Sequence, residues 1–386
     1  MPLAPITPEL VKDKIIVVRV DFNVPITNGK VSEKTRIKAS IPTLKLLADN
    51  GAKRVHILSH LGRPKGEYDK KYSLEVVMKD LQKFLGEEVE FRQDFTSGEA
   101  RFQLHENVRF HPGEKKNDPD LIQQMLKGMT PDLFINDGFA VSHRAHASVI
   151  GIGSFVPSYG GLLVQKEIQS LSPFLTKDKV NGLTVIIGGA KMETKVPVLR
   201  HFAAIADNIL LGGGIANTFL SAQGFDVGQS LYEPDAINIA REILSIAEHN
   251  QTGIHLPVDV VCADEIDATQ AIDIPVEDIA GDMKVFDLGA QSINSYQEVI
   301  QHSKTIIWNG PVGLFEKAPF EAGTREVLKA VAAQRSAETI LGGGDTLEAL
   351  KKYGVDQDIF SHVSTGGGSM LEFLEGKNLP GIDILQ

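Results

Sequence analysis

The sequence predicts an α/β protein with two doubly wound parallel sheets, joined by an interdomain helix. Its 386 residues exceed the roughly 250–300 at which one hydrophobic core stops growing, so more than one domain is expected. Hydrophobic residues make up 42% of the chain and charged residues 23%, an ordinary globular balance. Short β-branched runs alternate with stretches of helical spacing, which is typical of right-handed βαβ units.

The expected strands are apolar runs that are too short for helices. They are also too continuously apolar for a sheet with one solvated face, so they suit strands covered by helices on both sides. The strands are Ile15–Val20, Val55–Leu58, Leu133–Ile135, Thr184–Ile187, Asn208–Leu211, Val258–Val261, Thr305–Ile307 and Glu338–Leu341. The helices between them are Thr35–Asn50, Ser73–Leu85, Lys195–Ile205, Pro234–His249 and Ala322–Ala333.

One further helical pattern, Leu162–Leu171, begins after Gly160-Gly161 and ends at Ser172-Pro173. A helix at this place can connect two domains and pivot at its ends. We therefore expect an N-terminal domain over residues 1–165 and a C-terminal domain from residue 166 onward.

Composition excludes several classes of protein. The formal net charge of −11 disfavours a nucleic-acid or anionic-membrane partner. No apolar run approaches the ~20 residues that span a bilayer, and the N-terminus lacks the pattern of a secretory signal. Cys262 is the single cysteine, which excludes intrachain disulfides and thiolate-cluster metal sites. A cytoplasmic location is expected.

Charge is distributed unevenly along the chain. Residues 1–168 carry 24 Lys and Arg against 21 Asp and Glu, whereas the remainder carries 15 against 29. This difference is explained either by drift in surface composition or by a first half that holds a small, strongly anionic ligand.

Four glycine clusters in the second half each follow an apolar run, at residues 188–189, 212–214, 342–344 and 366–368. Glycines at the carboxyl ends of parallel strands let the backbone approach a phosphate, and the next helix offers free N–H groups. With Lys191 and Lys195 they indicate a nucleotide site. Neither a Walker loop nor a G-x-G-x-x-G fingerprint occurs. Asp345 suits either a Mg²⁺ ligand or a helix N-cap.

Polar side chains end the strands of the first half. Asp21 and Asn23 follow the first strand and point the same way by period two, so both suit the hydroxyls of a substrate. Arginine forks at strand ends suit a doubly anionic metabolite. The arginines that lie near strand ends, and the histidines close to them, are Arg36, His60, Arg63, Arg109, His143, Arg144 and His146. Taken singly, Arg19 or Arg109 fits a structural or surface role, and each histidine fits a satisfied, half-buried one.

Nine segments together resemble the phosphoglycerate kinase family, in that family's order and over essentially the whole chain. They are RVDFNVP (19–25), SHLGRP (59–64), ENVRFHPGE (106–114), HRAH (143–146), GGAKMETKVPVL (188–199), GGGIANTFL (212–220), WNGPVGLFE (308–316), GGGDT (342–346) and STGGGSMLEFLEGKNLPG (364–381).

The resemblance implies a glycolytic, ATP-dependent kinase that transfers a phosphoryl group reversibly between 1,3-bisphosphoglycerate and ADP. It implies two domains that face each other across a cleft and close by hinge bending, with phosphoglycerate on residues 1–165 and nucleotide with Mg²⁺ on residues 166–370. Residues 371–386 are expected to return to the N-terminal domain. The family is usually monomeric, so a monomer is expected.

Site residues follow from the motif match. The residues expected to bind phosphoglycerate are Asp21, Phe22, Asn23, Arg36, Ser59, His60, Leu61, Gly62, Arg63, Arg109 and Arg144. The residues expected to bind nucleotide are Lys191, Lys195, Gly214, Asn309, Glu316, Gly343, Gly344, Asp345 and Thr346, with Asp345 on the metal. The residues expected to act in catalysis are Arg36, Lys191, Gly344 and Gly367, by stabilising charge on the phosphoryl oxygens. No general base is needed, because the acceptor is a carboxylate.

Two segments depart from the family pattern. Asp137–Ser142 reads DGFAVS where the family usually has DAFGTA, which puts a direct backbone contact there in doubt. Ser369-Met370 follows Gly368, and Ser369 suits a helix cap. Two other functions remain open from the residues alone: a solute-binding protein that closes on an anion, and an acyl-phosphate-forming kinase with another carboxylate substrate.

Overall fold

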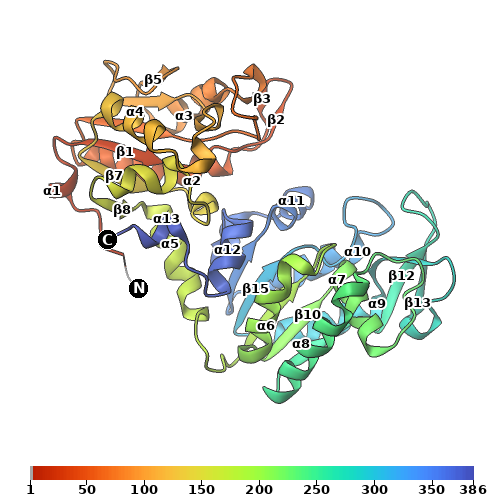
Figure 1. Ribbon diagram of the computed structural model, residues 1–386. Coiled ribbons are helices and arrows are strands. Elements are labelled where there is room, and N and C mark those ends of the chain that lie inside the picture. Colours follow the sequence, from red (N-terminus) through yellow and green to blue (C-terminus); the bar gives the residue numbers. More distant parts are fainter. Residues whose placement is uncertain (1–2) are drawn as a thin grey trace. The chain divides into compact units, whose positions relative to one another are not determined.

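The computed structural model describes residues 3–386. Met1 and Pro2, which begin the N-terminal segment that lacks a secretory-signal pattern, lie outside the described residues. The chain forms two compact units (Figure 1). Unit 1 comprises the residues up to Ser172 together with Lys377–Gln386, and unit 2 comprises Pro173–Gly376. The sequence places its domain divisions after residues 165 and 370.

Unit 1 contains a six-stranded parallel sheet in the order β5-β6-β4-β1-β7-β8. The strands are β1 (Ile15–Arg19), β4 (Arg54–Leu58), β5 (Val89–Arg92), β6 (Phe102–His105), β7 (Leu133–Asn136) and β8 (Ser158–Gly160). A short hairpin, β2 (Ile26–Thr27) with β3 (Lys30–Val31), follows β1.

Helices cover both faces of this sheet. On one face, α2 (Thr35–Asp49) packs against α3 (Met78–Leu85) and α5 (Leu162–Leu171), over a core that includes Ile16 and Val18 of β1. On the other face, α4 (Pro119–Met129) packs in a core with Val17. Successive β1 residues therefore enter different cores, which explains the continuous apolar run. The short helices α1 (Pro8–Val11) and α13 (Pro380–Asp383) complete the unit.

Unit 2 contains a second six-stranded parallel sheet, ordered β11-β10-β9-β15-β16-β17. The strands are β9 (Leu183–Ile187), β10 (Asn208–Leu211), β11 (Gly253–His255), β15 (Thr305–Asn309), β16 (Glu338–Gly342) and β17 (His362–Val363). This arrangement is doubly wound, as the sequence predicts, and its strand order reverses between β9 and β15.

The helices of unit 2 fall into two groups. The helices α9 (Ala290–Gln301), α10 (Ala322–Ala333) and α11 (Gly344–Lys352) share one core with β15 and β16. The helices α6 (Val196–Ile205), α7 (Gly213–Gln223) and α8 (Ile237–His249) pack together in front of the sheet in Figure 1. The last helix of the unit, α12 (Gly367–Leu374), contacts α6.

One expected strand belongs to a different sheet. The run Val258–Val261 corresponds to β12 (Asp259–Ala263), the centre of an antiparallel sheet between β13 (Ile272–Pro275) and β14 (Lys284–Leu288). The expectation that this run lies in a parallel sheet is therefore wrong. Val258, the first residue of the expected strand, is 53% exposed. A short apolar run looks the same in either sheet, so the pattern did not distinguish them.

The other seven expected strands lie in the two parallel sheets. All the expected helices are present, although the expected starts at Ser73 and Pro234 are single 3₁₀ turns that precede α3 and α8. Among residues 3–386, no helix is both long and apolar enough to cross a membrane.

Candidate active site

Two neighbouring strands of unit 1, β1 and β4, end side by side, and each is followed by a loop that is expected to bind the substrate. Arg19 of β1 pairs in register with Leu58 of β4. The Asn23 side-chain oxygen accepts from the Gly62 N–H at 2.8 Å, and the Ser59 hydroxyl accepts from the Phe22 N–H at 2.8 Å. These bonds join the loops after the two strands. They bring residues 21–23 and 59–62 together, as expected.

Phe22 and Leu61 differ from the other residues of these loops in their burial. Their side chains are buried in the core of unit 1. Only their backbone groups are therefore available to a ligand.

Arg36 lies in the first turn of α2 and reaches back to the loop after β1. Its Nη1 donates to the Asp21 carboxylate at 2.8 Å and to the Asn23 carbonyl at 3.0 Å. Glu33, three residues before Arg36, accepts from the Thr35 N–H. The Arg36 side chain stays 29% exposed, so part of the guanidinium remains available to a ligand.

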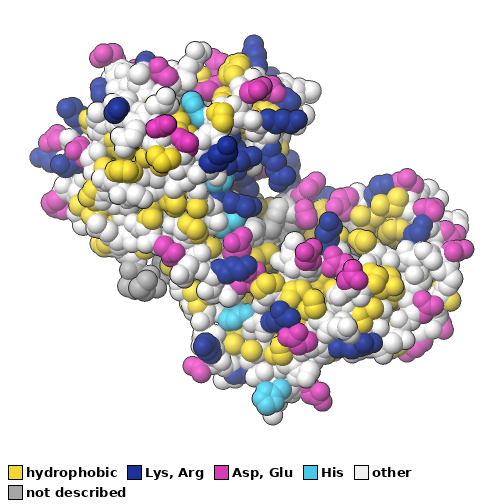
Figure 2. Space-filling model, in the orientation of Figure 1, with side chains coloured by type: hydrophobic (Ala, Val, Ile, Leu, Met, Phe, Trp, Pro, Cys, Tyr) yellow, Lys and Arg dark blue, Asp and Glu magenta, His cyan; other side chains and the backbone are white. Residues whose placement is uncertain are grey.

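The other arginines add positive charge to this edge of unit 1. Arg63 and Arg144 are exposed, and Arg109 is half-buried with its Nη1 donating to the Gly62 carbonyl at 2.7 Å. Burial lowers the pKa of Arg109 to about 10, with Arg19 and Arg63 adding to the effect. In Figure 2, Lys and Arg side chains gather along one edge of unit 1, with histidines beside them.

Three histidines lie among these arginines. Burial and the nearby guanidinium groups lower the pKa of His60 well below its usual value and the pKa of His143 and His146 to about 4. Arg109 contributes to all three shifts, so these side chains share one electrostatic environment. The histidines are therefore neutral at pH 7, and the positive charge comes from the arginines.

The glycine clusters of unit 2 lie where its parallel strands end. Gly212, Gly343 and Gly366 are the N-caps of α7, α11 and α12. A Cβ at Gly188 would overlap the Pro311 carbonyl, so the loops after β9 and β15 touch without room for a side chain. These two loops meet at the reversal of strand order, which is where ligands bind in open α/β sheets.

Two cap assignments from the sequence are wrong. Asp345 is not an N-cap, because Gly343 takes that place and Asp345 lies exposed in the first turn of α11. Ser369 is the third residue of α12 and is fully buried, so it caps nothing. A carboxylate such as Asp345 in a first helical turn is still favoured by the helix dipole.

Lys195 is held at the centre of the glycine loops. Its Nζ donates to the Asn309 side-chain oxygen, while the Asn309 amide donates to the Gly342 carbonyl at 3.0 Å. Burial lowers the pKa of Lys195 to about 8, against the opposing charge of Asp345. Thr346 is buried, and its hydroxyl accepts from the Gly310 N–H at 2.8 Å.

The other expected nucleotide ligands differ in exposure. Lys191 and Glu316 are exposed. Gly344 faces open space at the start of α11, and Gly214 packs against the Ala190 carbonyl. Gly367 lies close to Gly343, so the starts of α11 and α12 are adjacent.

The residues present fit a Mg²⁺ ion that arrives with a nucleotide. Among residues 3–386, no group of three or more His, Cys, Asp or Glu side chains is arranged to hold a metal by itself. Mg²⁺ in phosphotransferases is usually bound by one or two carboxylates together with substrate phosphates. Asp345, an exposed carboxylate beside Lys195, meets that requirement.

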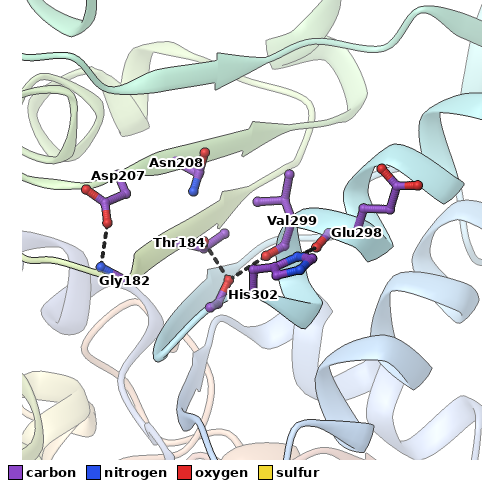
Figure 3. Close-up of a pocket in the computed structure, with 8 residues that line it drawn as sticks. Gly182, Thr184, Asp207, Asn208, Glu298, Val299 and His302 are labelled. Atoms are coloured by element: carbon purple, nitrogen blue, oxygen red, sulfur yellow. Dashed lines mark hydrogen bonds between the residues drawn. The ribbon is translucent and has the colours of Figure 1, made fainter.

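A separate pocket of about 330 Å³ lies where strands of the unit 2 sheet begin, at the opposite ends of these strands from the glycine loops (Figure 3). Gly182, Thr184 and Asn208, at the beginnings of β9 and β10, contribute to its lining with the end of α9. The glycine loops follow the other ends of these strands, so this pocket is not the expected nucleotide site.

Two buried residues were missed by sequence reasoning. Glu114 accepts from the Ser148 N–H at 3.0 Å and from the Ser148 hydroxyl at 2.6 Å, and both residues are fully buried. Glu114 ends the ENVRFHPGE segment, which is the only signal that could have drawn attention to it.

Two α/β units, one with arginines at its strand ends and the other with glycine loops beside the half-buried Lys195, are the features expected of a two-domain phosphotransferase. The sequence profile of the Phosphoglycerate kinase family matches residues 7–377. The chain therefore belongs to the phosphoglycerate kinase family, and it is a glycolytic, ATP-dependent phosphotransferase.

Individual relatives agree with this assignment. The chain is 44% identical over 382 residues to phosphoglycerate kinase of Francisella tularensis subsp. novicida, covering 97% of this chain and 96% of that one. It is 41% identical over 386 residues to that of Pelotomaculum thermopropionicum, covering 97% of each.

Two solved structures share the fold. The phosphoglycerate kinase of Coxiella burnetii superposes with a TM-score of 0.86 at 38% identity, covering 97% of this chain and 96% of that one. The Pyrococcus horikoshii enzyme superposes with a TM-score of 0.81 at 30% identity, with the same coverage.

Proposed function

We propose that unit 1 binds the phosphoglycerate and unit 2 binds MgADP or MgATP, in the transfer of a phosphoryl group between 1,3-bisphosphoglycerate and ADP. The observation that supports this division is the cluster of Arg36, Arg63, Arg109 and Arg144 at one edge of unit 1, two of them exposed. An excess of guanidinium over carboxylate favours a small, multiply charged anion.

In unit 1, we assign the phosphate of the substrate to the exposed arginines. Asp21 and Asn23 are assigned to the hydroxyl and carboxyl end, since both lie beside Arg36. His60 is neutral and buried, so it contributes a hydrogen bond rather than charge. The backbone of residues 59–62 completes the subsite.

In unit 2, we assign the nucleotide phosphates to Lys191, Lys195 and the N–H groups at the start of α11, where Gly344 leaves open space. Helix N-termini favour anions because their first N–H groups lack partners in the helix. Asn309 positions Lys195, Glu316 accepts from ribose hydroxyls, and Asp345 holds Mg²⁺. When bound, this ion neutralises charge on the phosphate oxygens.

The chemical step needs positioning more than acid or base catalysis, because the acceptor carboxylate has no proton to lose at neutral pH. Arg36, Lys191 and the N–H groups at Gly344 and Gly367 stabilise the charge that spreads over the three equatorial phosphoryl oxygens. Since the two ligands bind different units, transfer requires these units to close and exclude water. The chain crosses between units after Ser172 and after Gly376, which are the expected hinges.

We further propose that the enzyme is a cytoplasmic monomer. The low cysteine content supports a reducing compartment, since Cys262 is buried and is the one thiol in the chain. Sedimentation at micromolar concentration measures the oligomeric state directly.

The test of the function is an assay of purified protein with 3-phosphoglycerate, Mg²⁺ and ATP, coupled to reduction of the acyl phosphate formed. We expect turnover with 3-phosphoglycerate and none with acetate. Turnover with acetate alone would indicate another acyl-phosphate-forming kinase. Binding of 3-phosphoglycerate without turnover would favour a solute-binding protein.

A further inference from the structure

Glu114 is a fully buried carboxylate outside the set of expected ligands. Its two oxygens both meet Ser148: Oε2 accepts from the backbone N–H at 3.0 Å and Oε1 accepts from the hydroxyl at 2.6 Å. Burying a carboxylate is costly unless its charge and lone pairs are matched. The next contacts of Ser148 show how the charge is matched.

The Ser148 hydroxyl also accepts from Arg19 Nε at 2.9 Å. Arg19 is fully buried, and its Nη2 lies 3.2 Å from Nδ1 of His60. Burial lowers the pKa of Arg19, and the charges of Glu114 and then Asp21 oppose that effect. Glu114 is therefore a counter-ion of a buried guanidinium that contacts the expected phosphoglycerate subsite.

Ser148 also follows closely on the HRAH segment, which carries His143, Arg144 and His146. The Glu114 carboxylate lies 3.7 Å from Nδ1 of His146. The Glu114 carboxylate thus connects two places: Arg19 at the end of β1, through the Ser148 hydroxyl, and the residues that directly follow Arg144 in the chain. These contacts join positions 34 and 129 residues apart in the chain.

We propose that Glu114, acting through Ser148, is a positioning residue for the phosphoglycerate subsite. It fixes Arg19 beside His60 and fixes the segment that presents Arg144. Without this connection, both must be ordered when the substrate binds, and that ordering weakens binding. The inference depends on the proposed assignment of phosphoglycerate to unit 1. A purely structural ion pair would instead affect stability and leave the two Michaelis constants unchanged.

The test compares Ser148→Ala and Glu114→Gln with the control Ser158→Ala. Ser158 is also a buried serine of unit 1, but its hydroxyl donates to the backbone carbonyls of Gly153 and Val156 rather than to a charged side chain. Ser148→Ala should raise the KM for 3-phosphoglycerate about tenfold, which corresponds to about 1.4 kcal/mol and lies near the upper end of the net contribution of one hydrogen bond. The KM for ATP should stay unchanged, because its ligands lie in unit 2. Ser158→Ala should change neither KM.

Glu114→Gln should raise the same KM and also lower the melting temperature, because it removes the negative charge with the larger effect of the two that act on the buried Arg19 guanidinium and leaves only Asp21. If the Glu114→Gln protein does not fold, the KM values of Ser148→Ala alone test the proposal, since that substitution removes no charge. An unchanged KM for 3-phosphoglycerate in Ser148→Ala, or equal changes in both KM values, would overturn the proposal. So would a Ser148→Ala protein that fails to fold while Ser158→Ala folds. Failure of the proposed function is distinct, because the unmodified enzyme would then show no turnover.

Discussion

Replacing Arg36 with alanine should reduce kcat far more than it reduces stability. The Arg36 Nη1 bonds to Asp21 and to the Asn23 carbonyl, so the fork's other nitrogens are the ones expected to meet the transferring phosphoryl group. Removing one such charge-stabilising donor costs about 10²–10³ in kcat, or roughly 3–4 kcal/mol. Arg36→Lys should recover little, because an ammonium cannot reproduce the planar fork.

The stability effect should be small by comparison. The side chain of Arg36 is 29% exposed, so solvent screens its charge in part, and Asp21, whose side chain is 6% exposed, keeps the Asn23 N–H as a partner when Arg36 is removed. Partly exposed pairs contribute about 1 kcal/mol or less, which corresponds to about 2–4 °C in the melting temperature of a unit this size. The assay is kcat, both KM values and a melting curve for each variant.

Arg101→Ala provides the matched control. Arg101 also belongs to unit 1 and pairs with Glu87 at 3.3 Å on the surface, away from the expected ligands. It should lose little stability and no activity. A near-normal kcat in Arg36→Ala, together with a lowered melting temperature, would show that Arg36 is only a structural partner of Asp21.

Three further predictions concern ionisation and motion. The pKa of Lys195 is lowered to about 8, so affinity for ATP should fall as the pH rises from 7 to 9, and Lys195→Arg should remove that dependence in titrations of nucleotide binding. His56 and His105 are hydrogen-bonded at 2.8 Å, and burial lowers their pKa values to about 3 and 4. Their neutral forms stabilise the fold above pH 6.5, and this contribution is lost as the pH falls toward those values; His56→Gln should flatten that limb of the unfolding free energy. Small-angle scattering should give a smaller radius of gyration with both ligands than with either one, and an unchanged radius would place the hinges elsewhere.

The sequence predicted the central strands well and the peripheral elements poorly. Runs such as Ile15–Val20 and Thr184–Ile187 are mostly apolar because helices cover both faces of their sheets. The strand β6 was missed because it alternates Phe102, Gln103, Leu104 and His105, although all four residues are buried. The helix α7 was missed because it is apolar on nearly every side and begins with two glycines, so it shows no amphipathic period.

At the candidate site, sequence patterns suggested residues but did not indicate the contacts that these residues make. The position of Arg36 after β1 indicated proximity to Asp21, but spacing alone did not indicate the ion pair that these two side chains form. Glu114 could not be assigned because Ser148 lies 34 residues away and Arg19 lies at the end of another strand. Pairings of this kind depend on how the chain folds back, which local spacing does not contain.

The segment Lys377–Gln386, which belongs to unit 1, affects the order in which the two units can fold during synthesis. Unit 2 is in effect an insertion between Ser172 and Lys377 of unit 1. The Asn136 side chain donates to the Gly381 carbonyl at 2.7 Å, and the Gln386 N–H donates to the Ser158 carbonyl at 2.9 Å. Residues 377–386 are synthesised after unit 2, so unit 2 is complete before unit 1 has all of these parts. The Ala4 N–H also donates to the Gln386 carbonyl at 2.8 Å, so the earliest described residues of unit 1 pair with residues that are synthesised only after unit 2.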